Sequence, residues 1–138
     1  MKRNASLILV ELLIMLTVFA LAAALCLRVF VWSDNHSKQS AAEDLALLQT
    51  QNAAETLKHY RGDFFQAARE CGGRWDGESW DIAYDDNWNV TAGKAFYLLQ
   101  VIPVSCETDY LGQARLTVVD QAGSVLAELS VCWQEVEP

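Results

Sequence analysis

Three polar side chains in the second half of the chain have the chemistry of a cation site. Asp85, Asn87 and Asn89 alternate along the sequence and carry the hard oxygen ligands that Ca²⁺ prefers. An EF-hand loop starting at Asp85 would need Gly at its sixth position and Glu at its twelfth, where this chain has Val90 and Phe96. Because Asp and Asn also form turns between strands without any metal, we expect a turn here, with calcium as the weaker alternative.

The cysteines are the second group of reactive side chains. Cys26 lies in an apolar run and is expected to act as a small apolar filler. If the remainder of the chain is exported, the other three cysteines allow at most one internal disulfide. Cys106 and Cys132 are expected at the same end of a sheet, on strands separated by one neighbour, and Cys71 with Cys132 is the alternative pair.

No combination of residue types in the sequence is typical of a catalytic or cofactor site. There is no C-x-x-C pair, and His36 and His59 fall in a predicted helix. No cysteine is placed by the sequence beside a histidine. We therefore expect a protein that is not an enzyme and that has no metal or other cofactor.

The charge is divided unevenly along the 138 residues. Residues 1–32 carry Lys2, Arg3 and Arg28 against Glu11, a net charge of +2, whereas residues 33–138 carry 7 basic and 17 acidic side chains, a net charge of −10. Phosphate binding needs clustered Lys and Arg, so the acidic part is not expected to bind nucleic acid directly. Its charge is typical of a solvated surface.

An apolar run near the N-terminus predicts a membrane anchor. The 21 residues Leu7–Leu27 match the roughly 20 residues that a helix needs to cross the hydrocarbon core of a bilayer. Lys2 and Arg3 precede the run, and the next basic residue is Arg28. The short basic head is therefore expected in the cytoplasm and the C-terminal part outside the cytoplasmic membrane.

Three interpretations of this segment compete. Ala22-Ala23-Ala24 offers a signal-peptide cleavage site, but it leaves an apolar region of 18 residues, longer than usual, and an exposed apolar end. A plain, uncleaved signal anchor accounts for the length and the flanking charges of the segment but not for Glu11. An acidic side chain in a membrane helix is energetically costly, so it indicates a function and a partner for that side chain. The third interpretation supplies that partner.

The segment resembles the prepilin leader of type IV pilins and type II secretion pseudopilins. Those leaders have a short basic head, a small residue before the cut, an apolar start and a Glu as the fifth residue after the cut. Here the small residue is Ser6, the new N-terminus is Leu7 and the fifth residue is Glu11, within Leu9-Val10-Glu11-Leu12-Leu13. The family usually has Gly and Phe where this chain has Ser6 and Leu7.

The resemblance implies processing and assembly. Cleavage between Ser6 and Leu7, with N-methylation of Leu7, would leave an α-amine one helical turn from Glu11. In a filament, the Glu11 of one subunit would neutralise that amine on a neighbour. The implied partners are other pilin-like subunits, a prepilin peptidase, a membrane assembly platform and the lipid bilayer, and the filament could lie outside the cell.

The remainder of the chain predicts an α+β fold in which a long N-terminal helix, its first half spanning the membrane, packs on a small antiparallel β-meander. No Pro or Gly interrupts residues 2–61, so one helix is expected over about residues 6–60. Its apolar residues recur mostly every three or four positions, at Ala41, Leu45, Leu48, Ala53, Leu57, Tyr60 and Phe64.

Further along, a short helix is expected over residues 64–71, starting at an Asp63 N-cap, with strands near residues 74–76, 79–84, 95–104, 111–119 and 124–133. Trp75, Trp80, Trp88 and Trp133 are expected in the core and at the sheet edge, with the lining of a binding surface as the weaker alternative. The predicted organisation is a leader (1–6), a transmembrane helix (7–32), an amphipathic continuation of the helix (33–61) and a globular α+β head (62–138).

Overall fold

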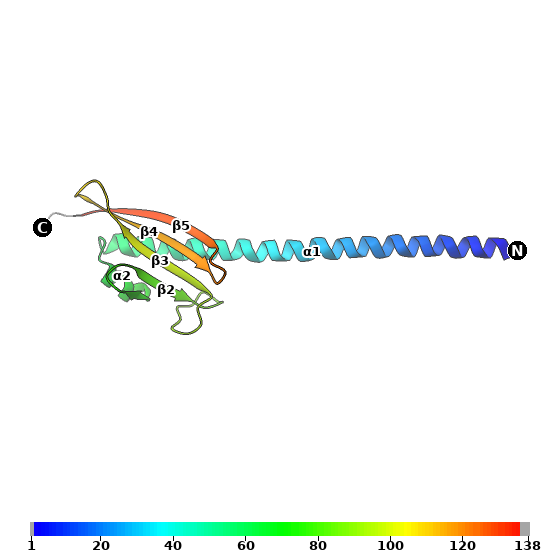
Figure 1. The fold of residues 1–138 in the computed structure, drawn as a ribbon, viewed down its shortest axis with the longest axis horizontal. Helices are drawn as coiled ribbons and strands as arrows, with labels where there is room; N and C mark the ends of the chain where they lie inside the picture. The colour runs from blue at the N-terminus through cyan, green and yellow to red at the C-terminus, as the bar shows by residue number, and fades with distance from the viewer. Residues whose placement is uncertain (1, 136–138) are drawn as a thin grey trace. The chain divides into compact units, whose positions relative to one another are not determined.

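The computed structural model describes residues 2–135, with side chains from residue 4 onward. The chain divides into two compact units, residues 1–40 and 41–138. Helix α1 (Lys2–His59) forms the first unit and continues into the second. The predicted uninterrupted helix is confirmed; it begins four residues earlier than expected and ends one residue earlier (Figure 1).

The first unit is a single helix whose residues 7–32 are mostly apolar. Every residue from 4 to 40 is exposed in the isolated chain. This helix is the one described element long and apolar enough to cross a membrane, with a mean hydropathy of 2.7 in its most apolar window. Polar contacts within this unit are local: the Thr17 hydroxyl donates to the Leu13 carbonyl at 2.8 Å, and Lys38 pairs with Asp34 at 2.8 Å.

Helix α1 ends in a tight left-handed turn. Arg61 and Gly62 have φ angles of 52° and 83°. The Gly62 N–H donates to the Leu57 carbonyl at 2.9 Å and the Arg61 N–H to the Lys58 carbonyl at 3.0 Å, the pattern of a Schellman cap. The predicted stop at Gly62 is confirmed, and the left-handed conformation begins one residue earlier, at Arg61.

Helix α2 (Phe64–Cys71) follows with the bounds predicted from the sequence. The Asp63 carboxylate accepts the Gln66 N–H at 3.1 Å and so caps its first turn, as expected. Phe64, Ala67 and Ala68 are the residues of α2 that enter the core.

Five antiparallel strands form one open sheet in the order β1-β2-β3-β4-β5, so the chain meanders and every strand pairs with its sequence neighbour (Figure 1). The predicted α+β architecture is confirmed, with strand ends shifted by no more than two residues. The strands are β1 (Arg74–Trp75), β2 (Trp80–Tyr84), β3 (Tyr97–Val104), β4 (Leu111–Asp120) and β5 (Val125–Gln134). The Asp120 carboxylate closes the last hairpin by accepting the N–H groups of Ala122 and Ser124.

The core lies between residues 46–57 of α1, helix α2 and one face of the sheet. Leu99, Leu116 and Ile82 face inward from three adjacent strands and are fully buried. On α1 the buried residues recur mostly every three or four positions. Most have small side chains, which let the helix approach the sheet closely: Ala46, Thr50, Ala53, Ala54 and Leu57.

One part of the predicted helix pattern is wrong. Ala41 is exposed, and Leu45 and Leu48 are 41% and 48% exposed rather than turned into the core. Thr50 takes a core position instead, which it tolerates because its hydroxyl donates to the Ala46 carbonyl at 2.7 Å. The leucines therefore remain on the surface of the second unit.

Candidate functional site

The most unusual surface of the described chain is the apolar part of α1. Between Leu7 and Trp32 lie 18 large apolar side chains that are roughly half or more exposed, up to 75% at Phe19. Soluble monomers rarely expose a contiguous apolar surface of this extent. The surface therefore needs a covering of lipid, of other protein, or of both.

The predicted processing and assembly residues lie at the start of this surface. Ser6, Leu7 and Glu11 are all helical and exposed. Four helical residues rise about 6 Å, so Glu11 lies one turn from the backbone nitrogen of Leu7. Among the side chains from residue 4 to 135, the three ion pairs present do not include Glu11.

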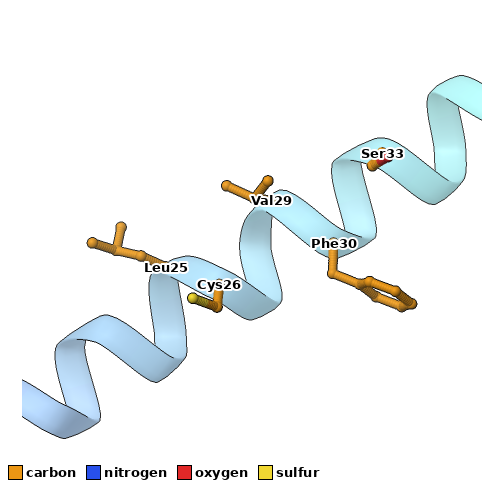
Figure 2. Close-up of a pocket in the computed structure, with 5 residues that line it drawn as sticks. All are labelled: Leu25, Cys26, Val29, Phe30 and Ser33. Atoms are coloured by element: carbon orange, nitrogen blue, oxygen red, sulfur yellow. The ribbon is translucent and has the colours of Figure 1, made fainter.

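Near its other end, the apolar surface carries a shallow groove along one face of the helix. Figure 2 shows its lining side chains along the same stretch of helix: Leu25, Cys26, Val29, Phe30 and Ser33. Their spacing of one and three or four residues places them on adjoining rows of a helix surface. The Cys26 thiol is exposed here, as a small side chain between larger ones.

The predicted cation-binding residues form a closed turn. The Asp85 carboxylate accepts the backbone N–H groups of Asn87 and Asn89, both at 2.9 Å. These hydrogen bonds, above all the one from Asn89, hold the pKa of Asp85 below its usual value. No group of three or more His, Cys, Asp or Glu side chains in residues 2–135 is arranged to hold a metal ion. The turn interpretation accounts for all three residues.

This turn also contains a strained residue. Trp88 has a φ angle of 63°, uncommon for a bulky side chain, and is 9% exposed. Its ring stacks on Tyr97 at a centroid distance of 4.0 Å with an interplanar angle of 8°. Packing against Tyr97 thus offsets the strain, and the turn serves to place Trp88 in the core.

The structure separates the cysteines onto two faces of the sheet. The Cys71 thiol lies 3.2 Å from the Thr56 hydroxyl, on the helix side. Cys132 is exposed on the outer face, directly opposite Gln113 in the β4–β5 pair. The Cys106 thiol lies 3.8 Å from the Gln113 carboxamide oxygen. All four cysteines are free thiols; Cys106 and Cys132 each neighbour Gln113, whereas Cys71 lies on the helix side.

The tryptophans of the head belong largely to the core, as predicted. Trp80, Trp133 and Trp88 are 0%, 8% and 9% exposed, and Trp75 stacks on Phe64 at 4.6 Å. Sequence reasoning gave no reason to distinguish Trp133 from the others. A Cβ atom on Gly62 or Gly112 would lie 2.3 or 2.2 Å from its indole nitrogen, so the ring packs against both glycines, and this packing depends on strand register and on the turn after α1.

Comparisons with protein-family models, with curated proteins and with solved structures found no match. The function of this chain is therefore inferred from its own residues and geometry.

Proposed function

We propose that the chain is a structural subunit, of the minor pilin or pseudopilin type, of a type IV pilus-like or secretion filament. It is inserted in the cytoplasmic membrane by the first half of α1, cut between Ser6 and Leu7, and assembled through the apolar helix. Its role is to pack with other pilin-like subunits rather than to catalyse a reaction. A prepilin peptidase and a membrane assembly platform act on it.

The observation that carries this proposal is the exposed apolar helix interrupted by a single acid. The 18 exposed apolar side chains between Leu7 and Trp32 would each gain about 1 kcal/mol or more on losing their remaining contact with water, on the order of 20 kcal/mol together. That gain supports stable insertion in a bilayer. It also allows transfer from lipid to a protein environment, since both are apolar.

Glu11 distinguishes an assembly element from a plain anchor. A lone acidic side chain in a spanning segment opposes insertion by up to about 3 kcal/mol at the centre of the membrane. After cleavage, the α-amine of Leu7 is a second charge that lipid solvates poorly. Pairing Glu11 of one subunit with the amine of a neighbour satisfies both charges. It also fixes the register between subunits, because losing one partner of a buried pair is strongly destabilising.

The exposed leucines of the second unit extend the surface available for packing. Leu45, Leu47 and Leu48 are 41%, 42% and 48% exposed on the part of α1 whose opposite face covers the sheet. Side chains of this kind gain from burial against a neighbouring subunit. A contact there would continue the helix–helix packing beyond the membrane.

The mature N-terminus tests the proposal directly. The full chain is expressed in a bacterial host with and without a prepilin peptidase, and the intact protein is analysed by mass spectrometry. The proposal expects a peptidase-dependent chain that starts at Leu7, with or without one added methyl group. A chain that starts at Met1 in the presence of the peptidase contradicts it, as does a chain that starts at Leu25.

Assembly is tested with Glu11→Gln and a matched control. Glu55→Gln makes the same change on the same helix, where Glu55 forms only an exposed pair with Lys58 at 3.6 Å. The quantity measured is the amount of the chain in filaments sheared from cells, relative to the amount in the membrane. Glu11→Gln should lower this ratio at least tenfold, as expected for losing one side of a buried pair worth about 3 kcal/mol, and Glu55→Gln should leave it unchanged.

The second candidate function is an uncleaved, signal-anchored binding module outside the cytoplasm. Ser6 and Leu7, which stand where the pilin family usually has Gly and Phe, favour this alternative. It predicts a mature chain that still starts at Met1. It also predicts that Glu11→Gln has no effect on the distribution of the chain, since an anchor needs no partner for that side chain.

A further inference from the structure

Strand β5 is an open edge of the sheet. It is the last strand in the order, so one of its sides pairs with β4 and the other pairs with no strand among residues 2–135. The Glu135 N–H donates to the Tyr110 carbonyl at 2.9 Å, which fixes the alternation of hydrogen bonds along the β4–β5 pair. Alternate residues of β5, here called the paired set, therefore bond to β4, and the N–H and C=O groups of the others, the open set, point away from it. The paired set is Ala127, Leu129, Val131 and Trp133, and the open set is Glu128, Ser130, Cys132 and Gln134.

The opposite edge of the sheet is protected, whereas the β5 edge is not. Strand β1 has two residues, and beyond it the Thr91 N–H donates to the Ala83 carbonyl at 2.9 Å, so the chain itself covers the rest of β2. Strand β5 has 10 residues, contains no Pro or Lys, and pairs regularly with β4 except for one bulge near its start. Native edge strands are usually short, charged, bulged, interrupted by Pro or covered. A long edge without these devices is typical of a site at which another chain adds a strand.

A second copy of β5 does not fit this edge when both chains are anchored in one membrane. Two antiparallel β5 strands would be related by a two-fold axis normal to the sheet, and residues 46–57 of α1 pack along one face of that sheet (Figure 1). The axis would therefore reverse the direction of α1, whereas chains that enter the same membrane by the N-terminal part of α1 need parallel helices. A symmetric parallel pair aligns identical residues, so its slanted bonds would join the open set to the paired set, which is already bonded to β4. The strand that occupies the edge is therefore expected to come from a different protein.

The side chains beside the edge set the chemistry of that strand, because successive side chains of a strand alternate between the two faces of a sheet. On the face toward α1, Ala127 and Leu129 are half-buried against the core, so residues that lie beside them gain from being apolar. On the outer face, the open set is exposed and polar. Glu128 carries the one charge of β5 and pairs with Arg115 of β4 at 3.5 Å. A basic side chain opposite Glu128 would add a favourable cross-strand pair.

We infer that β5 binds an extended segment of a different exported protein as a sixth strand, apolar on the face toward α1 and polar on the outer face, with a basic side chain opposite Glu128. Hydrogen bonds to the open set supply the attachment, and the alternation of side chains supplies the selectivity. The edge gives the head a docking function in addition to assembly. The choice of a different protein rests on membrane anchoring, whereas the open edge belongs wholly to the second unit and does not depend on filament formation.

The test measures amide hydrogen exchange by NMR in the full chain, labelled with ¹⁵N, in detergent micelles. In the free chain, the open set should exchange faster than the paired set. The probe is a nine-residue peptide with blocked ends, Thr-Val-Thr-Val-Lys-Val-Thr-Val-Thr, which as a strand has valines on one face and the lysine on the other. The peptide should slow the exchange of the open set by about tenfold or more and leave the paired set unchanged. If it leaves the open set unchanged as well, the inference is overturned.

Variants of the open set separate strand addition from nonspecific binding. Ser130→Pro removes an N–H that points to the open edge and leaves the bonds to β4 in place, so it should abolish the protection by the peptide. Ser130→Ala keeps that N–H and should preserve the protection. Glu128→Gln changes an exposed side chain, so it avoids the risk that the proline variant fails to fold. It should weaken the affinity for the peptide about threefold and leave unchanged the affinity for the same peptide with Thr in place of Lys.

Three results would contradict the inference. Protection of the open set in the free chain that rises with protein concentration would assign the edge to a second copy. Equal protection by the peptide in Ser130→Pro and Ser130→Ala would place the peptide elsewhere on the head. An unchanged affinity of Glu128→Gln for the lysine peptide would remove the basic side chain from the chemistry of the partner.

Discussion

The side of α1 that faces the sheet can be tested with one pair of substitutions. Leu57 is fully buried between α1 and the sheet, and its helical neighbours in the core, Ala53 and Ala54, are too small to fill a gap. Leu57→Ala should therefore leave a cavity that collapses poorly and lower the free energy of unfolding of the head by about 3–4 kcal/mol. For a head of about 100 residues, the melting temperature should fall by about 15 °C or more.

Leu48→Ala is the matched control, because it removes the same atoms from the same helix at a side chain that is 48% exposed. It should change the free energy of unfolding by no more than about 0.5 kcal/mol. Both variants are compared with the unmodified full chain in detergent micelles, by thermal unfolding followed through the near-ultraviolet circular dichroism of the buried tryptophans. If Leu48→Ala destabilised the head as much as Leu57→Ala, the helix face seen in the structure would be wrong and the pattern predicted from the sequence would be right. In cells, the proposed assembly role expects Leu48→Ala to reduce filament incorporation although the head remains stable.

Three further outcomes follow from individual side chains of the head. Backbone N–H groups hold the pKa of Asp85 below its usual 3.8, so the stabilisation that they give is present above about pH 4 and is lost as the pH falls through the lowered value. The urea concentration at the midpoint of unfolding should therefore drop in acid. Asp85→Asn should make this midpoint depend less on pH. Burial, with a smaller contribution from nearby Cys71, raises the pKa of Tyr84 to about 12. The stability that this residue contributes is therefore full below pH 10 and is lost as the pH rises toward 12, and an ultraviolet titration should show a late tyrosine transition near pH 12 that is absent in Tyr84→Phe. Mild oxidation of the head should not join Cys71 to Cys132, because Cys71 lies on the helix side of the sheet and Cys132 on its outer face; peptide mapping under non-reducing conditions would show that pair if the strand register were different.

The sequence determined the elements because their signals are local. An unbroken run without Pro or Gly predicts α1, Asp63 predicts the start of α2, and alternating residues between turns predict the strands. The membrane-length apolar run and the position of Glu11 within it are equally local. These two features identify the candidate assembly residues without any knowledge of the head, because the length of the run must match the thickness of a lipid bilayer and does not depend on tertiary packing.

Only the tertiary structure decided which side chains meet. The sequence could not show that Thr50 rather than Leu48 faces the sheet. Small side chains on this face let the helix approach the sheet closely, and the spacing of apolar residues along the sequence does not predict that close approach. It left the pairing of the cysteines open, and the fold then placed Cys71 on the helix side of the sheet and Cys132 on its outer face. The packing of the Trp133 indole against Gly62 and Gly112 has no local signal at all, since the three residues are brought together from the turn after α1, from β4 and from β5.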